Sequence, residues 1–188
     1  MADEYRILDD LVRNHYANVV WTHKIQEKQA EIYEVYHKRL ATTNIITASL
    51  TSAGVFSAIF INPTWLKIIS AIASFITTAI SAYLTAFDYK SMAIANKATA
   101  TKLVGLRDEL LVLLAKIKFR QQTVQQLTEE FDALQQRVHD VYTDAPNTTP
   151  KAVDKAEISL KVNKDGTYTD ADIDLLLPNA LRRGCEDE

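Results

Sequence analysis

Hydroxyl side chains recur along one face of an apolar segment. Successive steps of 4, 3, 4 and 4 residues separate five of them, so a helix would carry all five on one stripe: Ser70, Ser74, Thr77, Ser81 and Thr85. Small and hydroxyl residues at this spacing let membrane helices approach closely and hydrogen-bond across the contact. Polar side chains in membrane helices also turn towards water-filled cavities. The stripe therefore indicates either helix packing or a pore wall, and these five residues are the pore-lining candidates.

The titratable side chains show no pattern of an active site. The single cysteine, Cys185, is interpreted as an incidental thiol of the tail, because a catalytic thiol needs a shaped site that lowers its pKa. The glycines are scattered and form no phosphate-binding loop. The histidines lie far apart in the sequence, without metal-ligand spacing, at positions His15, His23, His37 and His139.

One short motif resembles part of a calcium-binding loop. It reads Asn163-x-Asp165-Gly166, but the first ligand position would then be Lys161, whose charge repels a metal ion. A turn is the better interpretation. We therefore expect no catalytic residue, no cofactor and no metal site, and no enzyme activity.

Two consecutive stretches lack formal charge. One lies between Arg39 and Lys67, and the other between Lys67 and Asp88. A helix needs about 20 apolar residues to cross a bilayer core. The pattern predicts one membrane span over residues 44–61 and a second over residues 65–87. The alternative is a hydrophobic helix pair inside a soluble bundle.

The predicted spans are joined by Asn62-Pro63-Thr64, a turn signal so short that the spans must be antiparallel neighbours. Lysine and arginine flank the outer ends of both spans, and such residues favour the cytoplasmic side. Both termini are therefore expected in the cytoplasm. No basic segment precedes an early apolar run, so no cleavable signal peptide is expected. The flanking cations are Lys24, Lys28, Lys38, Arg39, Lys90, Lys97, Lys102 and Arg107.

Long helical arms are predicted on either side of the spans. Residues 4–43 contain neither glycine nor proline, and residues 88–142 contain one glycine, Gly105. Apolar residues in the second arm recur at alternating steps of 3 and 4, a heptad pattern that requires a partner helix. The first arm is expected to fold back along the second and to leave the residues beyond about 121 for the tail or another subunit to cover. The predicted arm- or oligomer-packing residues are Leu103, Leu106, Leu110, Leu113, Ile117, Val124, Leu127, Phe131, Leu134 and Val138.

These elements predict an all-α chain: a membrane two-helix hairpin with long cytoplasmic coiled-coil arms and a short C-terminal helical tail. Its parts are an N-terminal arm (1–43), the two-span hairpin (44–87), a return helix (88–142) and the tail (143–188), which opens with a proline-punctuated linker. The formal net charge of −3 argues against a nucleic-acid-binding protein, which normally carries a basic excess.

The tail contains the most distinctive sequence motifs. They are TPKAVDKAE over residues 149–157 and TDADID over residues 169–174, followed by Leu177-Pro178. Together with the hairpin and the arms, it resembles the SLATT domains, the SMODS- and SLOG-associating two-span effectors of bacterial conflict systems. The resemblance implies an effector of the bacterial inner (plasma) membrane that contacts lipid and forms a homo-oligomeric pore.

The resemblance also implies what would open the pore. A nucleotide cyclase or sensor protein, or its cyclic nucleotide product, would supply the signal of infection, and depolarisation would arrest or kill the cell. Two other readings stay open: a membrane-anchored coiled-coil scaffold or sensor without a pore, and a soluble helical toxin that inserts its hairpin at a target membrane. The toxin should be soluble when it is made alone, which the long charge-free stretches disfavour.

Overall fold

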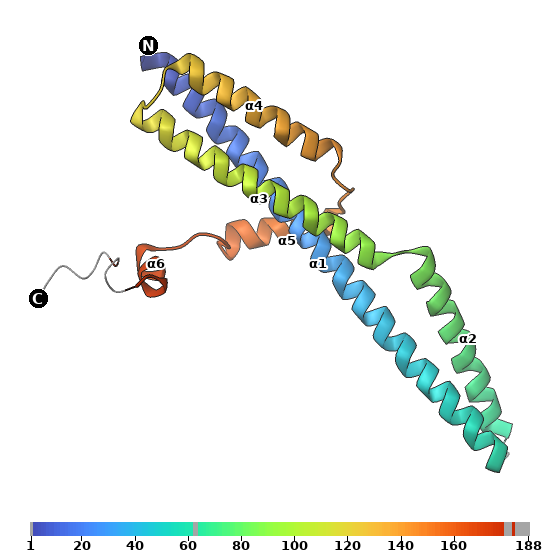
Figure 1. Cartoon of the computed structure of the whole chain (residues 1–188). Coiled ribbons are helices and arrows are strands. Elements are labelled where there is room, and N and C mark those ends of the chain that lie inside the picture. The colour runs from blue at the N-terminus through green and yellow to red at the C-terminus, as the bar shows by residue number, and fades with distance from the viewer. Residues whose placement is uncertain (1, 62–63, 179–181, 183–188) are drawn as a thin grey trace, which may run out of the picture.

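The computed structural model describes residues 2–61, 64–178 and 182. Helices make up most of these residues, and no strand occurs among them, which confirms the all-helical prediction (Figure 1). The predicted turn residues Asn62 and Pro63 and the tail thiol of Cys185 lie outside the described part. The helices are α1 (Ala2–Ile61), α2 (Thr64–Ala86), α3 (Tyr89–Phe119), α4 (Val124–Thr143), α5 (Pro150–Glu157) with its π-helical continuation η1 (Ile158–Val162), and α6 (Asp170–Leu176).

Helix α1 extends through 60 residues and runs nearly the full length of the molecule (Figure 1). No glycine or proline interrupts it before Gly54, and both residue types weaken helix interiors. Two acidic residues, Asp3 and Glu4, lie in its first turn, where they favour the positive end of the helix dipole. The first half of α1 packs with α3 and α4, and α2 lies beside its last third (Figure 1).

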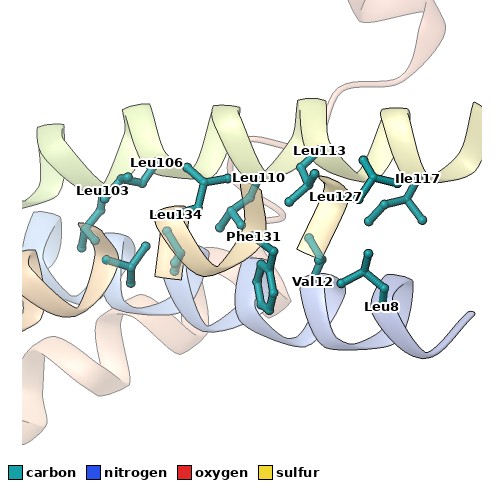
Figure 2. Packing of buried hydrophobic residues seen from close by; sticks show 12 residues of the cluster. Leu8, Val12, Leu103, Leu106, Leu110, Leu113, Ile117, Leu127, Phe131 and Leu134 are labelled. Atoms are coloured by element: carbon teal, nitrogen blue, oxygen red, sulfur yellow. The ribbon is translucent and has the colours of Figure 1, made fainter. Parts of the chain in front are cut away.

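A three-helix bundle of α1, α3 and α4 holds the apolar core (Figure 2). The heptad residues predicted for arm or oligomer packing are buried here within one chain, except for the partly buried Val124. The facing residues of α1 complete the core. The buried cluster comprises Leu8, Val12, Val19, Leu103, Leu106, Leu110, Leu113, Ile117, Leu127, Phe131, Leu134 and Val138.

The return helix is not continuous over residues 88–142, so that prediction is wrong. Helix α3 ends at Phe119 and is followed by its C-cap Arg120, whose φ of 50° is left-handed; Thr123 then caps the start of α4 with a capping box to Gln126. Tyr5 of α1 fixes the turn, because its hydroxyl donates to the carbonyl oxygen of Gln122 at 2.9 Å. Its ring also lies 5.4 Å from the Arg120 guanidinium carbon. Helix α4 therefore folds back, and the residues that were expected to overhang pack against α1 and α3 of the same chain.

The apolar surface of α2 is left uncovered by the rest of the chain. Among the described residues, one helical stretch, Thr64–Phe119, has the length and composition to cross a membrane, and 6% of its most apolar window is buried. The core helix of a soluble protein would be mostly buried. This stretch contains the second predicted span. The first predicted span falls in the last part of α1, and its residues 58–61 lie beyond the side chains that the structure describes.

The bundle core yields a stability prediction. Leu127→Ala should lower the free energy of unfolding of the bundle by about 2–5 kcal/mol, because it leaves a cavity at a side chain with no solvent exposure. Thermal or denaturant unfolding followed by circular dichroism of the detergent-solubilised protein measures the loss. Gln135→Ala, an exposed site on the same helix, is the control. Equal stability of the two variants would contradict this account of the core.

Candidate functional site

Polar side chains meet between α1 and α2 along a contact that we call the seam: Asn44, Thr47 and Gly54 of α1 with Ser70, Thr77 and Ser81 of α2. Thr77 Oγ1 lies 2.9 Å from Thr47 Oγ1. Asn44 Nδ2 donates to Ser81 Oγ at 3.1 Å, and the Ser81 hydroxyl lies 3.3 Å from Asn44 Oδ1. Hydrogen bonds of this kind join helices where water is absent.

The two helices approach closely where Gly54 faces Ser70. A Cβ atom added at Gly54 would lie 2.1 Å from Ser70 Oγ and 3.3 Å from Ser70 Cβ. Glycine is therefore the residue that fits at position 54. Ser70 is 6% exposed, and its Oγ has no hydrogen-bond partner within the described chain. A buried, unpaired hydroxyl is costly, so this atom needs an explanation.

The structure divides the five predicted pore-lining residues. Ser70, Thr77 and Ser81 point into the seam, whereas Ser74 and Thr85 are exposed. The stripe drifts around the helix, because steps of 4 residues overshoot a turn of 3.6. Its members thus lie in the seam and along one edge of it. In this arrangement of α1 and α2, which we call the closed pair, Ser70, Thr77 and Ser81 therefore serve in helix packing.

The outer surfaces of the same helices are apolar. Large side chains project outwards from both, with Phe75 77% and Phe56 65% exposed. A large exposed apolar surface of this kind marks a site of membrane or protein contact. The exposed large residues of this surface include Ile45, Ile46, Leu50, Val55, Phe56, Trp65, Ile68, Ile69, Ile72, Phe75 and Ile76.

An aromatic cluster marks the junction of the apolar pair with the bundle. The chain bends at Asp88, whose carboxylate caps α3 by accepting from the Ser91 amide. Beside the bend, the hydroxyl oxygens of Tyr83 and Tyr89 lie 2.9 Å apart, and this hydrogen bond raises the pKa of Tyr89 to about 12. The Tyr33 ring lies 5.7 Å from that of Tyr89. Tyrosine is typical of the level where a bilayer meets water.

The C-terminal linker is fastened to α1 by two buried glutamines. Gln29 Oε1 accepts from both the backbone N–H and the hydroxyl of Thr149, each at 2.8 Å. Gln26 Nε2 donates to the carbonyl oxygen of Pro146 at 3.1 Å. Small residues on the next helix turns are then buried against the bundle: Ala152, Ala156 and Ser159. Sequence reasoning missed this contact, because its partners lie 120 residues apart and glutamine in a helix is usually solvated.

A pocket of about 370 Å³ lies between α1, α3 and the turn after η1, lined in part by Tyr16 and Trp21. Its cations already have partners: Lys24 pairs with Glu27 at 2.8 Å, and Arg107 pairs with Asp108 at 2.7 Å. Because both side chains are already in ion pairs, the pocket does not present Lys24 or Arg107 as an unpaired cation to an anionic ligand.

The histidines do not converge on a catalytic or metal-binding group. The His15 ring packs edge-on against Phe131, with the centroids 5.6 Å apart. Burial lowers the pKa of His15 and is also the largest influence on His23, whose pKa is lowered. No group of three or more His, Cys, Asp or Glu side chains that could hold a metal ion occurs within the described residues.

The glutamine contact yields a second prediction. Gln29→Ala removes the acceptor for both Thr149 donors, so the free energy of local opening should fall by about 1–3 kcal/mol. Hydrogen exchange measured by mass spectrometry should then be faster over residues 149–159. Glu34→Ala, at an exposed site of the same helix, is the control. Unchanged exchange in Gln29→Ala would show that the glutamine does not hold the tail.

A comparison with protein families found one match for this chain. The family described as SMODS and SLOG-associating 2TM effector domain family 4 matches residues 8–172. This confirms the resemblance noted from the tail and the arms. No curated protein and no solved structure matches the chain.

Proposed function

Because the chain belongs to the SMODS and SLOG-associating 2TM effector domain family 4, we propose that it is an effector of the bacterial inner membrane that forms a pore when infection is signalled. One observation carries the proposal: α1 and α2 are apolar outside and polar where they meet. A soluble pair of helices has the opposite arrangement. Lipid suits the outer surface, and the seam supplies polar groups for water.

In the proposed arrangement α2 and the last third of α1 cross the bilayer as a hairpin. The bundle and both termini lie in the cytoplasm, on the side where lysine and arginine flank the spans. The aromatic cluster around Tyr89 would lie at the cytoplasmic membrane surface. Helix α1 thereby joins the bundle to the membrane without a break.

Several copies are needed for conduction, since two helices cannot enclose a water-filled channel. The homo-oligomer would place the polar stripe of α2 towards a common axis and the bulky surface towards lipid. The candidate lining residues remain Ser70, Ser74, Thr77, Ser81 and Thr85. Ion flow through such a pore would depolarise the membrane and lead to growth arrest or death.

The trigger in this proposal is a nucleotide cyclase or sensor protein, or the cyclic nucleotide that it makes. The cytoplasmic bundle and its fastened tail are the parts within reach of such a signal. A signal can shift the pore equilibrium only by binding the open state more tightly than the closed state.

Conductance in planar bilayers tests the proposal directly. Purified protein should give discrete current steps, which a cognate signal should increase; cyclic dinucleotides are the first probes. Silence under all conditions, from protein shown by crosslinking to be oligomeric and by protease protection to be inserted, would favour the membrane-anchored scaffold instead.

Charge substitution identifies the lining helix. Ser74→Glu and Ser74→Lys should shift the reversal potential under a salt gradient in opposite directions, because a ring of like charges sets ion preference. Ile72→Ala, on the outer apolar surface, should leave the reversal potential unchanged. If the Glu and Lys variants have equal reversal potentials, α2 does not line the pore at this level.

A further inference from the structure

We propose that the pore opens when α1 and α2 part, so that the seam itself becomes the wall of the channel. This inference rests on the proposed pore function and extends it. It adds Asn44 and Thr47 of α1 to the lining residues of α2, and it makes the closed helix pair the resting state.

The distribution of polar groups favours parting over an assembly of closed pairs. In the closed pair, the seam holds the hydroxyl and amide groups that hydrogen-bond between the helices. Two exposed hydroxyls of α2 are bonded to carbonyl oxygens of their own helix: Thr78 donates to the Ser74 carbonyl and Thr85 to the Ser81 carbonyl, each at 2.9 Å. A ring of closed pairs would keep the side chains of the seam out of contact with water, whereas parted helices would expose the whole seam.

The hydrogen bonds of the seam can be exchanged for water with little loss. Once the helices part, the Thr77 hydroxyl can donate to the carbonyl of Ala73, 2.9 Å away, and the Thr47 hydroxyl to the carbonyl of Thr43, 3.0 Å away. Parting therefore breaks only the contacts between the helices. Water that enters an opened seam can replace the hydrogen bonds that are lost between α1 and α2.

Ser70 gains outright from opening. Its Oγ is buried and has no partner within the described chain, so the closed state leaves one hydroxyl unsatisfied. Hydration would satisfy it. Gly54 opposes this gain, because its missing Cβ is what allows the helices to close over Ser70. The pair of Gly54 and Ser70 thus sets the balance between closed and parted helices.

Opening also accounts for the two stripe residues outside the seam. Ser74 and Thr85 are exposed, one at each end of the run that contains Thr77 and Ser81. When α1 moves away, all five hydroxyls of the stripe face the same water-filled space. The full stripe then has one role, which it does not have while the helices are closed.

A crosslink across the seam tests the inference. The two Oγ1 atoms of Thr47 and Thr77 are 2.9 Å apart, so Thr47→Cys/Thr77→Cys, in a Cys185→Ser background, brings two thiols within reach of a disulfide or a short methanethiosulfonate bridge. Bridging should reduce conductance in planar bilayers to background, and reduction should restore it. The single-cysteine variants, oxidised alike, form no bridge between α1 and α2, so each should keep the conductance that it shows before oxidation.

The outcomes separate the inference from the proposed function. Full conductance from protein whose seam bridge is shown to be complete by mass spectrometry would overturn the inference and leave pore formation intact. If the reduced double variant and the wild type are both silent when oligomeric and inserted, the proposed function fails instead, and the inference fails with it.

Substitutions at the close approach provide an independent arm. Gly54→Ala places a methyl group against Ser70 Oγ and should raise conductance in the absence of any signal. Ser70→Ala removes the unsatisfied hydroxyl and should lower it. The double variant should lie between them, since the remaining contact between the two Cβ positions, at 3.3 Å, is tight but can be tolerated. A fall in conductance in Gly54→Ala together with a rise in Ser70→Ala would contradict the inference.

Discussion

The architecture depends on one helix that packs by two opposite rules. In its first half, α1 buries apolar side chains such as Leu8, Val12 and Val19 against α3 and α4. In its last third, it turns Asn44 and Thr47 towards α2 and leaves Phe56 exposed. The first half packs as helices do in water, where the burial of apolar surface drives association. The last third packs as helices do in hydrocarbon, where close approach and hydrogen bonds hold them together.

Sequence periodicity identified the core residues but not the fold of the arm that carries them. Ile117 and Val124 are one heptad apart, so the apolar series continues across the turn as if the helix did. Both helices present this series to the same core, which makes a break invisible to periodicity. The available signal was the Thr123–Gln126 capping box, a local feature that marks a helix start.

The polar stripe shows a different limit. Spacing predicts which residues share a helix face, but it does not tell what that face meets. Ser70, Thr77 and Ser81 meet α1, a fact that depends on the relative rotation of two helices. The glutamine contact with Thr149 was beyond reach for a related reason, since a buried amide that binds a distant backbone group has no local pattern.

The length and continuity of α1 make it a lever. Its 60 residues span about 90 Å, and among the other helices of the described residues only α3 is more than half as long. A rigid rod that pivots near its middle turns a tilt of about 5° into a displacement of about 4 Å at each end, given the rise of 1.5 Å per residue. That displacement is comparable to a side-chain contact distance. A tilt of α1 at Gln29, close to its middle, would therefore appear as a displacement of this size at the far end beside α2.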